Sequence, residues 1–227
     1  MTQHILLTGA SRGIGAAIAA TLKPGNRLFA ASSRDADLSA DGAADALWDK
    51  ALDALGGRVD VLVNNAGIFE EAPLADDGWT TSWRRTMTIN LEASAILCRR
   101  AVLHWQEKGA PGRIINIASR AAYRGDSPAH WHYAASKGGM VAMTKTIARA
   151  YARENILAFA VCPGFTLTGM AEEYLSSRGG DALLADIPLG RVATPEEIAA
   201  IVAFLAKDAP PSMTGAVLDA NGASYVR

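Results

Sequence analysis

The sequence predicts an α/β fold, a doubly wound parallel sheet in which helices cover both faces. Short apolar runs alternate with amphipathic helical stretches through most of the chain, a pattern typical of β-α-β units. No internal repeat and no linker rich in Pro, Gly or Ser divides the 227 residues, half of which are hydrophobic. We therefore expect one domain over residues 1–227, with three layers and a substantial core.

Six strands are expected, at residues 5–8, 27–32, 59–64, 113–119, 157–162 and 216–219. Helical patterns occupy residues 13–22, 42–55, about 80–107, 132–153 and 195–206. The last helix opens with Thr194 and Pro195, a capping residue followed by proline at the first helical position, and two acids come next.

The second strand is followed by an unusually short connection. Only Ser33-Arg34-Asp35 separates it from Ala36-Asp37-Leu38-Ser39, whereas a parallel crossover needs about a dozen residues or more. No helix fits there, so the next strand that can form is the one at residues 59–64.

Charge and cysteine content narrow the class of protein. The chain carries 22 basic and 23 acidic side chains, with a pI near 6.4, and lacks the surplus of Lys and Arg that nucleic-acid or anionic-membrane surfaces need. It has no apolar run long enough to span a membrane and no secretory signal at its N-terminus. Cys98 and Cys162 stand in apolar surroundings, as buried hydrophobic residues do, so we expect a soluble protein of the reducing cytoplasm.

The first strand runs directly into a glycine-rich turn. Gly9, Gly13 and Gly15 stand between that strand and an alanine-rich helix. Glycines at such a junction allow backbone N–H groups to approach a pyrophosphate, which the helix N-terminus also favours. The spacing alone also fits a merely structural turn, but a strand before it and a helix after it favour dinucleotide binding in a Rossmann-like fold.

The sequence Asn64-Asn65-Ala66-Gly67 ends the third strand, at the carboxyl edge where open α/β sheets bind ligands. Considered alone, the two asparagines favour a plain turn in which their amides bond locally. A place at the ligand-binding edge is the alternative.

The end of the second strand bears on the choice of dinucleotide. An acid there would hold the ribose hydroxyls of NAD, whereas a basic residue would favour the phosphate of NADP. The order here is Ala31-Ser32-Ser33-Arg34, the first acid is Asp35, and Arg12 adds a positive charge in the glycine turn. We expect NADP rather than NAD, with Arg34 as a solvated loop charge and Asp35 as a ribose ligand left as alternatives.

A second cluster of polar residues has the chemistry of proton transfer. Ser119 ends the fourth strand, and fourteen positions later Tyr133 opens a helix with Lys137 four residues on, so phenol and ammonium share one helical face. An unperturbed tyrosine, with a pKa near 10, is a poor acid or base at neutral pH, and the Lys137 cation with an oxidised nicotinamide would lower that pKa. Such a pair in isolation is usually a surface pair, but its place downstream of a dinucleotide turn favours catalysis.

These residues resemble motifs of the short-chain dehydrogenase/reductase family, in particular those of its β-ketoacyl-acyl-carrier-protein reductases. The motifs follow the family's order along nearly the whole chain. They are Thr8-Gly9-Ala-Ser-Arg-Gly13-Ile-Gly15, Asn64-Asn65-Ala66-Gly67, Asn90 in Thr-Ile-Asn-Leu, Ser119 in Ile-Asn-Ile-Ala-Ser, Tyr133-Ala-Ala-Ser-Lys137 and Pro163-Gly164-Phe-Thr-Leu-Thr168.

The resemblance implies four catalytic residues. Tyr133 would be the general acid or base, and Lys137 would hold the ribose and lower the tyrosine pKa. Ser119 would hydrogen-bond the carbonyl oxygen, and Asn90 would support a proton relay through water. Without the family, Asn90 would be interpreted as a helix-surface or kink residue.

The resemblance also implies a cofactor site, in which Asp37 and Leu38 contact the adenine and the segment from Pro163 to Thr168 holds the nicotinamide amide. The expected cofactor residues are Gly9, Ser11, Arg12, Gly13, Ile14, Gly15, Ser33, Arg34, Asp37, Leu38, Asn65, Ala66, Gly67, Tyr133, Lys137, Pro163, Gly164, Thr166 and Thr168. No metal is expected, because His130 and His132 have no third ligand, and we interpret them as exposed residues at the helix entry.

The short connection after the second strand departs from the family pattern. In the family a further helix and strand follow, and that strand forms one edge of the sheet. Its loss predicts a six-stranded sheet whose new edge is the strand at residues 27–32, as in some shortened bacterial hydroxysteroid dehydrogenases and dihydropteridine reductases. The departure affects the adenine pocket and the cofactor preference but not the catalytic residues.

Two segments are expected to shape the substrate site. The loop at residues 120–131 carries Tyr123 and Trp131, and the segment at about residues 169–190 resembles the family's mobile lid and carries Met170, Tyr174 and Leu175. The expected substrate contacts are Ser119, Tyr123, Trp131 and Tyr174. An aromatic and apolar lining suits a moderately hydrophobic ketone or alcohol.

Together these features predict an oxidoreductase that transfers a hydride between NADP(H) and a ketone or secondary alcohol. One alternative is an NAD-dependent secondary-alcohol dehydrogenase, hydroxysteroid-like or sugar-like. Another is a catalytically silent NADP-sensing protein, against which the intact catalytic set counts. The expected partners are the small-molecule substrate and copies of the same chain, since the family implies a homotetramer or homodimer.

Overall fold

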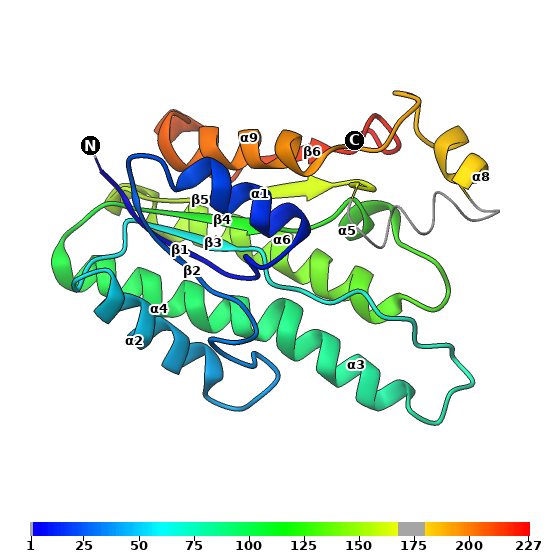
Figure 1. Cartoon of the computed structure of the whole chain (residues 1–227), viewed down its shortest axis with the longest axis horizontal. Helices are drawn as coiled ribbons and strands as arrows, with labels where there is room; N and C mark the ends of the chain where they lie inside the picture. The colour runs from blue at the N-terminus through cyan, green and yellow to red at the C-terminus, as the bar shows by residue number, and fades with distance from the viewer. Residues whose placement is uncertain (1, 168–179) are drawn as a thin grey trace.

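A six-stranded parallel sheet forms the centre of the computed structural model, which describes residues 2–167 and 180–227 (Figure 1). The strands are β1 (His4–Leu7), β2 (Arg27–Ala30), β3 (Val61–Asn64), β4 (Gly112–Ile117), β5 (Ile156–Pro163) and β6 (Val217–Ala220), in the order β2-β1-β3-β4-β5-β6. Every neighbouring pair is parallel, and β2 forms one edge. The structure thus confirms the predicted sheet and its predicted edge.

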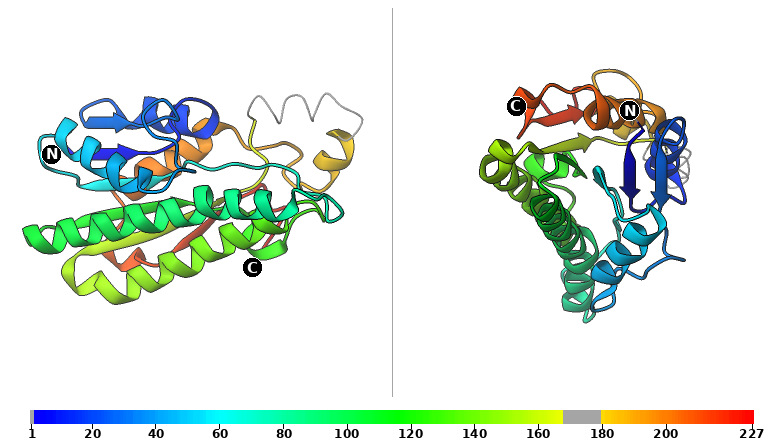
Figure 2. Two further views of the ribbon diagram at one scale, coloured as in Figure 1. Left: turned by 90° about the horizontal axis from the view of Figure 1, so that it is seen from below. Right: turned by 90° about the vertical axis from the view of Figure 1, so that its left-hand side faces the viewer.

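Helices cover both faces of the sheet and complete three layers (Figures 1 and 2). On one face α1 (Gly13–Leu22) packs against α9 (Pro195–Lys207). On the other lie α2 (Ala43–Ala54), α4 (Ala93–Lys108) and α6 (Trp131–Tyr151), with α3 (Trp79–Met87) leading into α4. In Figure 2 the long helices α4 and α6 run beside each other. No helix in the described part of the chain is both long and apolar enough to cross a bilayer.

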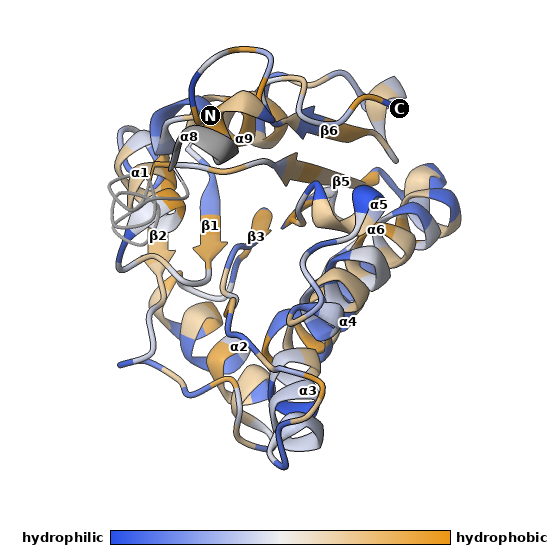
Figure 3. Ribbon diagram, turned by 90° about the vertical axis from the view of Figure 1, so that its right-hand side faces the viewer, coloured by the Kyte–Doolittle hydropathy of each residue, from blue (hydrophilic) through white to orange (hydrophobic). Residues whose placement is uncertain are grey.

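The core lies on both sides of the sheet because successive strand residues point to opposite faces. Leu6 of β1 belongs to the cluster that contains Trp48 of α2, whereas the next residue, Leu7, packs with Ile18 of α1 and Val202 of α9. Figure 3 looks onto the end of the sheet where the strands finish, and there β3 and β5 are coloured as hydrophobic segments. A sheet buried on both faces accounts for the near-continuous apolar runs in the sequence.

The chain between β2 and α2 forms neither a strand nor a helix of its own. It turns at Ser32, whose carbonyl oxygen accepts hydrogen bonds from the backbone of Asp35 and Ala36, and Leu38 then packs on the core beneath α2. The connection therefore passes directly to α2 and β3, as its length predicts.

Two details of the predicted elements were wrong. The helix expected at about residues 80–107 is interrupted by the π-helix η1 (Thr88–Glu92), which separates α3 from α4. Several short elements were not predicted, namely α5 (Ala121–Arg124), η2 (Ala152–Glu154), α8 (Gly180–Ala185) and η3 (Pro211–Met213). One turn of helix is too short to produce a hydrophobic period, and a π-turn leaves the apolar pattern on either side nearly intact.

The start of α9 follows its sequence signals closely. The Thr194 hydroxyl accepts a hydrogen bond from the Glu197 N–H (3.3 Å), and the Glu197 carboxylate accepts one from the Thr194 N–H (2.8 Å), which is a capping box. The Arg191 guanidinium, together with this bond, lowers the pKa of Glu197 to about 2.

Candidate active site

The glycine turn between β1 and α1 leaves no room for side chains. Gly9 has a φ of +68°, and a Cβ there would lie 2.7 Å from the Cα of Ala66. A Cβ at Gly15 would lie 2.0 Å from the carbonyl oxygen of Gly9. The Asn65 amide donates to the carbonyls of Thr8 (3.1 Å) and Gly9 (3.0 Å), so it braces the turn from β3. The prediction that this amide bonds locally was wrong.

The N-terminus of α1 is free to meet an anion. Arg12 precedes the helix in an extended conformation without a capping side-chain hydrogen bond, and the first turn contains no acid. Ser11 and Arg12 are exposed, while Gly13 (φ +52°) and Ile14 are partly buried. Unpaired backbone N–H groups and the positive end of the helix dipole suit a pyrophosphate. The residues of this turn thus fit a dinucleotide.

The side chains at the end of β2 differ in whether they already have hydrogen-bond or ion-pair partners. Both carboxylate oxygens of Asp35 have partners, since one accepts from the N–H (3.0 Å) and hydroxyl (3.1 Å) of Ser32 and the other from the Lys50 ammonium (3.0 Å). Those bonds, that of the Ser32 N–H first, lower the pKa of Asp35. Ser33 and Arg34 are exposed, and the Arg34 guanidinium makes no hydrogen bond or ion pair with the described residues.

The next residues of this loop are Asp37 and Leu38, which were expected to contact the adenine. The Asp37 carboxylate accepts hydrogen bonds from the N–H (3.0 Å) and hydroxyl (2.7 Å) of Ser39, and these bonds lower its pKa. Leu38 is partly buried against the core under α2. Asp37 itself is exposed, as is Arg34, and both follow β2 in the chain.

Asn90 lies at the centre of the π-helix η1 and is fully buried. Its amide oxygen accepts from the N–H of Ile68 (2.8 Å), while its Nδ2 donates to the carbonyl of Ile68 (3.0 Å) and to the Ser136 hydroxyl (3.3 Å). A Cβ on Gly67 would come within 3.2 Å of the Asn90 Oδ1 and 3.5 Å of the Lys137 Nζ. Asn90 is therefore an interior residue at a kink, which joins β3, η1 and α6 beside Lys137.

Lys137, Tyr133 and Ser119 converge where β4 meets α6. Lys137 is 4% exposed, its ammonium donates to the carbonyl of Ile117 (2.8 Å), and it lies 5.8 Å from the Tyr133 ring centroid. Ser119 stands two residues beyond the end of β4, rather than within the strand as expected, and its hydroxyl hydrogen-bonds Tyr133. The Ser119 oxygen accepts from the Ala121 N–H (3.1 Å), so the hydroxyl proton is available for another acceptor.

Burial dominates the protonation of this group. It raises the pKa of Tyr133 to about 12, against the opposing effect of the Ser119 hydrogen bond, and it lowers the pKa of Lys137 to about 8. Among the protein's own groups, Lys137 does not offset the effect of burial on the phenol. The expectation that the Lys137 cation lowers the tyrosine pKa is therefore not met by the protein's own residues, and the effect of an oxidised nicotinamide stays a prediction.

The buried ammonium predicts a stability effect. The folded-state pKa of Lys137 lies below its ordinary value of 10.5, so wild-type stability should rise as the pH rises from about 8 to 10.5. We expect Lys137→Met to be more stable than wild type at pH 7, by about 2 kcal/mol after the lost Ile117 hydrogen bond is allowed for. Urea unfolding should show this gain shrinking at pH 9.5. A variant less stable than wild type at pH 7, where the exposed Lys145→Met is neutral, would contradict the prediction.

The Phe69 ring contacts Tyr133, and two histidines associated with Phe69 were assigned wrongly. The Phe69 ring lies edge-on to Tyr133, with centroids 4.7 Å apart, and stacks flat on His130 at 3.9 Å. His130 and His132 are 5% and 2% exposed, so they are buried and not exposed helix-entry residues. They lie inside because Phe69 covers one ring and the Glu70 carbonyl binds the other. Among the described residues no group of His, Cys, Asp and Glu could hold a metal.

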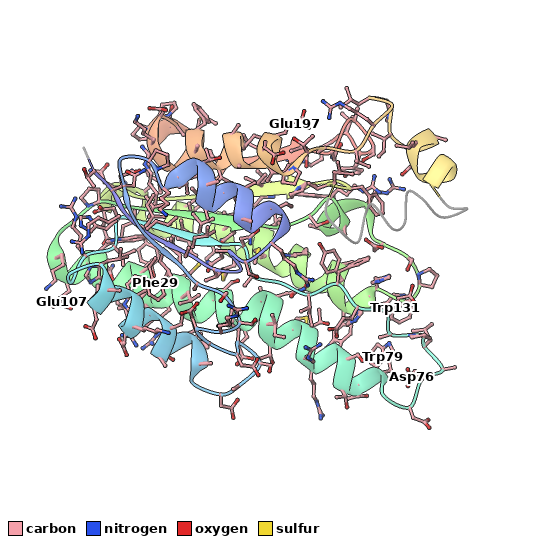
Figure 4. The ribbon with its side chains drawn as sticks, viewed as in Figure 1. Phe29, Asp76, Trp79, Glu107, Trp131 and Glu197 are labelled. Atoms are coloured by element: carbon pink, nitrogen blue, oxygen red, sulfur yellow. The ribbon has the colours of Figure 1, made fainter. Side chains whose placement is uncertain are left out.

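Of the two described aromatic residues expected at the substrate, Tyr123 is directed elsewhere, whereas Trp131 is exposed and stays a prediction. The Tyr123 ring stacks on Tyr225, and its hydroxyl accepts a hydrogen bond from Arg227 (3.0 Å), so it packs on the C-terminal segment and not beside Tyr133. Trp131 is 53% exposed and makes no ring contact with another described residue, and Figure 4 places it at the same end of the molecule as Trp79. Sequence reasoning missed Phe69, whose only signal was its place two residues after Asn64-Asn65-Ala66-Gly67.

The end of β5 forms the opposite side of the site. Gly164 packs closely against Asn221, where a Cβ would lie 2.8 Å from the Cα, and the partly exposed turn continues to the buried Thr166. The carbonyl of Pro163 accepts from the Arg120 N–H (2.9 Å), which links this turn to the residue after Ser119. Thr168, Met170, Tyr174 and Leu175 lie outside the described residues, as does the expected lid up to residue 179.

The part of the expected lid that is described begins with α8 and is held in place. The Asp186 carboxylate pairs with Arg124 (2.6 Å) and Arg120 (3.5 Å) of the Ser119 loop. The Arg120 guanidinium lies 4.9 Å from the centroid of Phe165. Residues 184–190 are therefore fixed to both the Ser119 loop and the β5 turn.

Comparison with known proteins agrees with this geometry. A family model described as enoyl-(acyl carrier protein) reductase matches residues 23–222, and catalogued relatives of similar length align over nearly the whole chain. The chain belongs to the short-chain dehydrogenase/reductase family. Its relatives are dehydrogenases and reductases that act on CH–OH and C=O groups, so this protein is an oxidoreductase of that class.

Three relatives show the range of activities in the family. A 3-oxoacyl-[acyl-carrier-protein] reductase of Synechocystis is 36% identical over 97% of this chain and 96% of its own. A 3beta-hydroxysteroid dehydrogenase 1 of Eggerthella lenta is 35% identical over 96% and 92%, and an acetoacetyl-CoA reductase of Shinella zoogloeoides is 33% identical over 99% of each chain. The last two alignments span 242 positions, more than the 227 residues of this chain, so both relatives contain residues that it lacks.

Proposed function

We propose that the protein is a reductase of ketones, or in the opposite direction a secondary-alcohol dehydrogenase, that uses NADP(H). The observation that carries the proposal is the convergence of Ser119, Tyr133, Lys137 and Asn90 at the carboxyl edge of the sheet, on the same edge as the glycine turn. Open α/β sheets bind their ligands at this edge.

Each catalytic side chain has a role that its contacts support. The Ser119 hydroxyl donates a hydrogen bond to the substrate carbonyl oxygen, and Tyr133 delivers a proton to that oxygen during reduction. Asn90 holds the Gly67-Ile68 backbone in place next to Lys137 and supports a relay of protons to the phenol. Burial of these groups strengthens their mutual hydrogen bonds.

The cofactor is proposed to lie across the carboxyl edge from β2 to β5. A bound nicotinamide supplies or accepts the hydride. The turn at Gly9, Gly13 and Gly15 would hold the pyrophosphate, Lys137 the ribose, and the turn at Pro163 and Gly164 the nicotinamide amide. On the adenine side, Asp37 and Leu38 would contact the base.

NADP preference rests on the charges at the end of β2. Arg34 and Arg12 have no partner among the described side chains, whereas the carboxylate of Asp35 is fully engaged. An exposed, unpaired guanidinium suits the 2′-phosphate. We expect Arg34→Ala to lower the ratio of kcat/KM with NADPH to that with NADH roughly 10-fold. The control is Arg99→Ala, an exposed residue of α4, which should leave the ratio unchanged. If Arg34→Ala also left the ratio unchanged, Arg34 would be a solvated charge and the NAD-dependent alternative would be favoured.

The direct test of the function is a screen of ketones and secondary alcohols. Absorbance of NADPH and NADH is followed with wild type, and the Tyr133→Phe protein serves as the blank. Turnover of at least one ketone by wild type and none by the blank supports the proposal, and equal rates contradict it.

Three further features of the protein are proposed. We propose that residues 1–227 act as one nucleotide-binding domain with the substrate segment near residues 169–190. The free, buried thiols of Cys98 and Cys162 suit a reducing cytoplasm. Assembly as a homodimer or homotetramer rests on the family resemblance, and size-exclusion chromatography with light scattering would measure it.

A further inference from the structure

The loop that carries Phe69 is anchored on both sides of this residue, although the Phe69 side chain is exposed. The residue before it, Ile68, has both backbone groups bound by the Asn90 amide (2.8 and 3.0 Å). The residue after it, Glu70, binds the imidazole of His132 through its carbonyl and pairs with Arg85 through its carboxylate. Further on, the Ala72 N–H donates to the carbonyl of Ala129 (2.9 Å). The loop that carries Phe69 is thus tied to η1, α3 and the start of α6.

One face of the Phe69 ring is backed by His130. The two rings are parallel within 2° at 3.9 Å, and His130 is itself fixed by a 2.7 Å hydrogen bond between its Nδ1 and the Ser127 hydroxyl. Phe69 cannot rotate into that space, because His130 is 5% exposed and surrounded by protein. A ring whose rotamer is locked by its neighbours makes a pre-formed wall for a ligand.

Phe69 remains 39% exposed although it touches Tyr133. Its ring lies at 80° to the phenol ring, with centroids 4.7 Å apart, so its exposed surface borders the residue that exchanges a proton with the substrate. Other exposed apolar side chains near this end, such as Trp131 (53%) and Leu74 (54%), make no ring contact with Tyr133. Among the described aromatic residues, Phe69 combines exposure with a ring contact to Tyr133.

We propose that Phe69, backed by His130, is a specificity-determining residue that receives a ring-bearing apolar substituent on one side of the substrate carbonyl. The inference rests on the proposed function, because it takes the substrate carbonyl to be bound at Tyr133. A flat substituent can lie against the exposed part of the Phe69 ring in an offset or edge-to-face arrangement. A short alkyl substituent leaves much of that surface in water and gains less.

The test uses two β-keto esters that differ in one substituent. Ethyl 3-oxo-3-phenylpropanoate carries a phenyl group on the ketone, and ethyl 3-oxobutanoate carries a methyl group there. We expect Phe69→Ala to lower the ratio of kcat/KM for the phenyl ester to that for the methyl ester roughly 10-fold. Phe69→Leu, which stays apolar and fills most of the space, should lie in between, and His130→Ala should change the ratio in the same direction. Leu74→Ala is the matched control and should leave the ratio unchanged.

A binding measurement separates this role from an effect on proton transfer. In the Tyr133→Phe protein saturated with NADPH, titration calorimetry should show that Phe69→Ala weakens binding of the phenyl ester roughly 10-fold, with little change for the methyl ester. Equal losses for both esters would make Phe69 a support of Tyr133 and overturn the inference. A wild-type enzyme that reduces ketones but shows the same ester ratio in Phe69→Ala contradicts this inference alone, whereas a wild type that reduces no ketone contradicts the proposed function.

Discussion

Replacement of Tyr133 by Phe is expected to lower kcat/KM for ketone reduction by about 10²- to 10⁴-fold, the range that a positioned general acid contributes. The phenol beside Ser119 is the proposed proton donor, and the ring without its hydroxyl keeps the contact with Phe69. Because the change removes one oxygen at the substrate end of the site, NADPH affinity should stay within about two-fold of wild type. Steady-state kinetics and fluorescence titration with NADPH measure the two quantities.

The matched control for this variant is Tyr151→Phe, at the other end of α6. Tyr151 packs against the core beneath α2 and α4 and stands five turns away from Tyr133 by helix geometry, at about 27 Å. Its loss should leave kcat/KM near wild type. Near-normal turnover by Tyr133→Phe would remove Tyr133 from the proton transfer and with it the central role proposed here.

Gly15→Ala is expected to weaken both NADPH and NADH binding at least about 10-fold and to destabilise the fold by about 1–3 kcal/mol or more. The new Cβ would lie 2.0 Å from the carbonyl oxygen of Gly9 and 2.5 Å from the Asn65 Nδ2, so the turn and its brace must move apart. Equilibrium unfolding in urea and titration with each dinucleotide measure the two effects.

A helical glycine with free space provides the comparison. Gly138 lies within α6, and a Cβ there would find its nearest neighbour, the carbonyl oxygen of Ala122, at 3.7 Å. Gly138→Ala should therefore stabilise the protein by about 0.5–1 kcal/mol through helix propensity. If Gly15→Ala behaved in the same way, the close approach of α1 to the glycine turn would have no part in holding the dinucleotide.

The sheet could be predicted because parallel strands that are buried on both faces appear in the sequence as apolar runs. The length of each connection then limits which elements can lie between two strands. The three residues between Ser32 and Ala36 were enough to place β2 at the edge. Side-chain direction was harder to predict. Tyr123 and Trp131 belong to the same aromatic loop. Tyr123 packs on Tyr225 and Arg227, whereas Trp131 is exposed to solvent.

The residues around Tyr133 show most clearly what the sequence alone does not predict. A π-helix places Asn90 inside the protein, and nothing in a single sequence distinguishes it from a residue on a regular helix. His130 and His132 are polar and lie at a helix entry, which predicts exposure, yet the loop after β3 folds over them. The protonation of Tyr133 and Lys137 likewise depends on burial, which only the folded chain reveals.

The most direct measurement of the central claim follows the hydride itself. NADPH that carries deuterium at both C4 positions of the nicotinamide, so that transfer from either face delivers the label, is incubated with the protein and a ketone found active in the screen. The product alcohol is examined by mass spectrometry. We predict one deuterium on the carbinol carbon with wild type and a rate of product formation at least about 10²-fold lower with Tyr133→Phe. Alcohol without deuterium, or labelled alcohol formed equally fast by both proteins, would contradict the account.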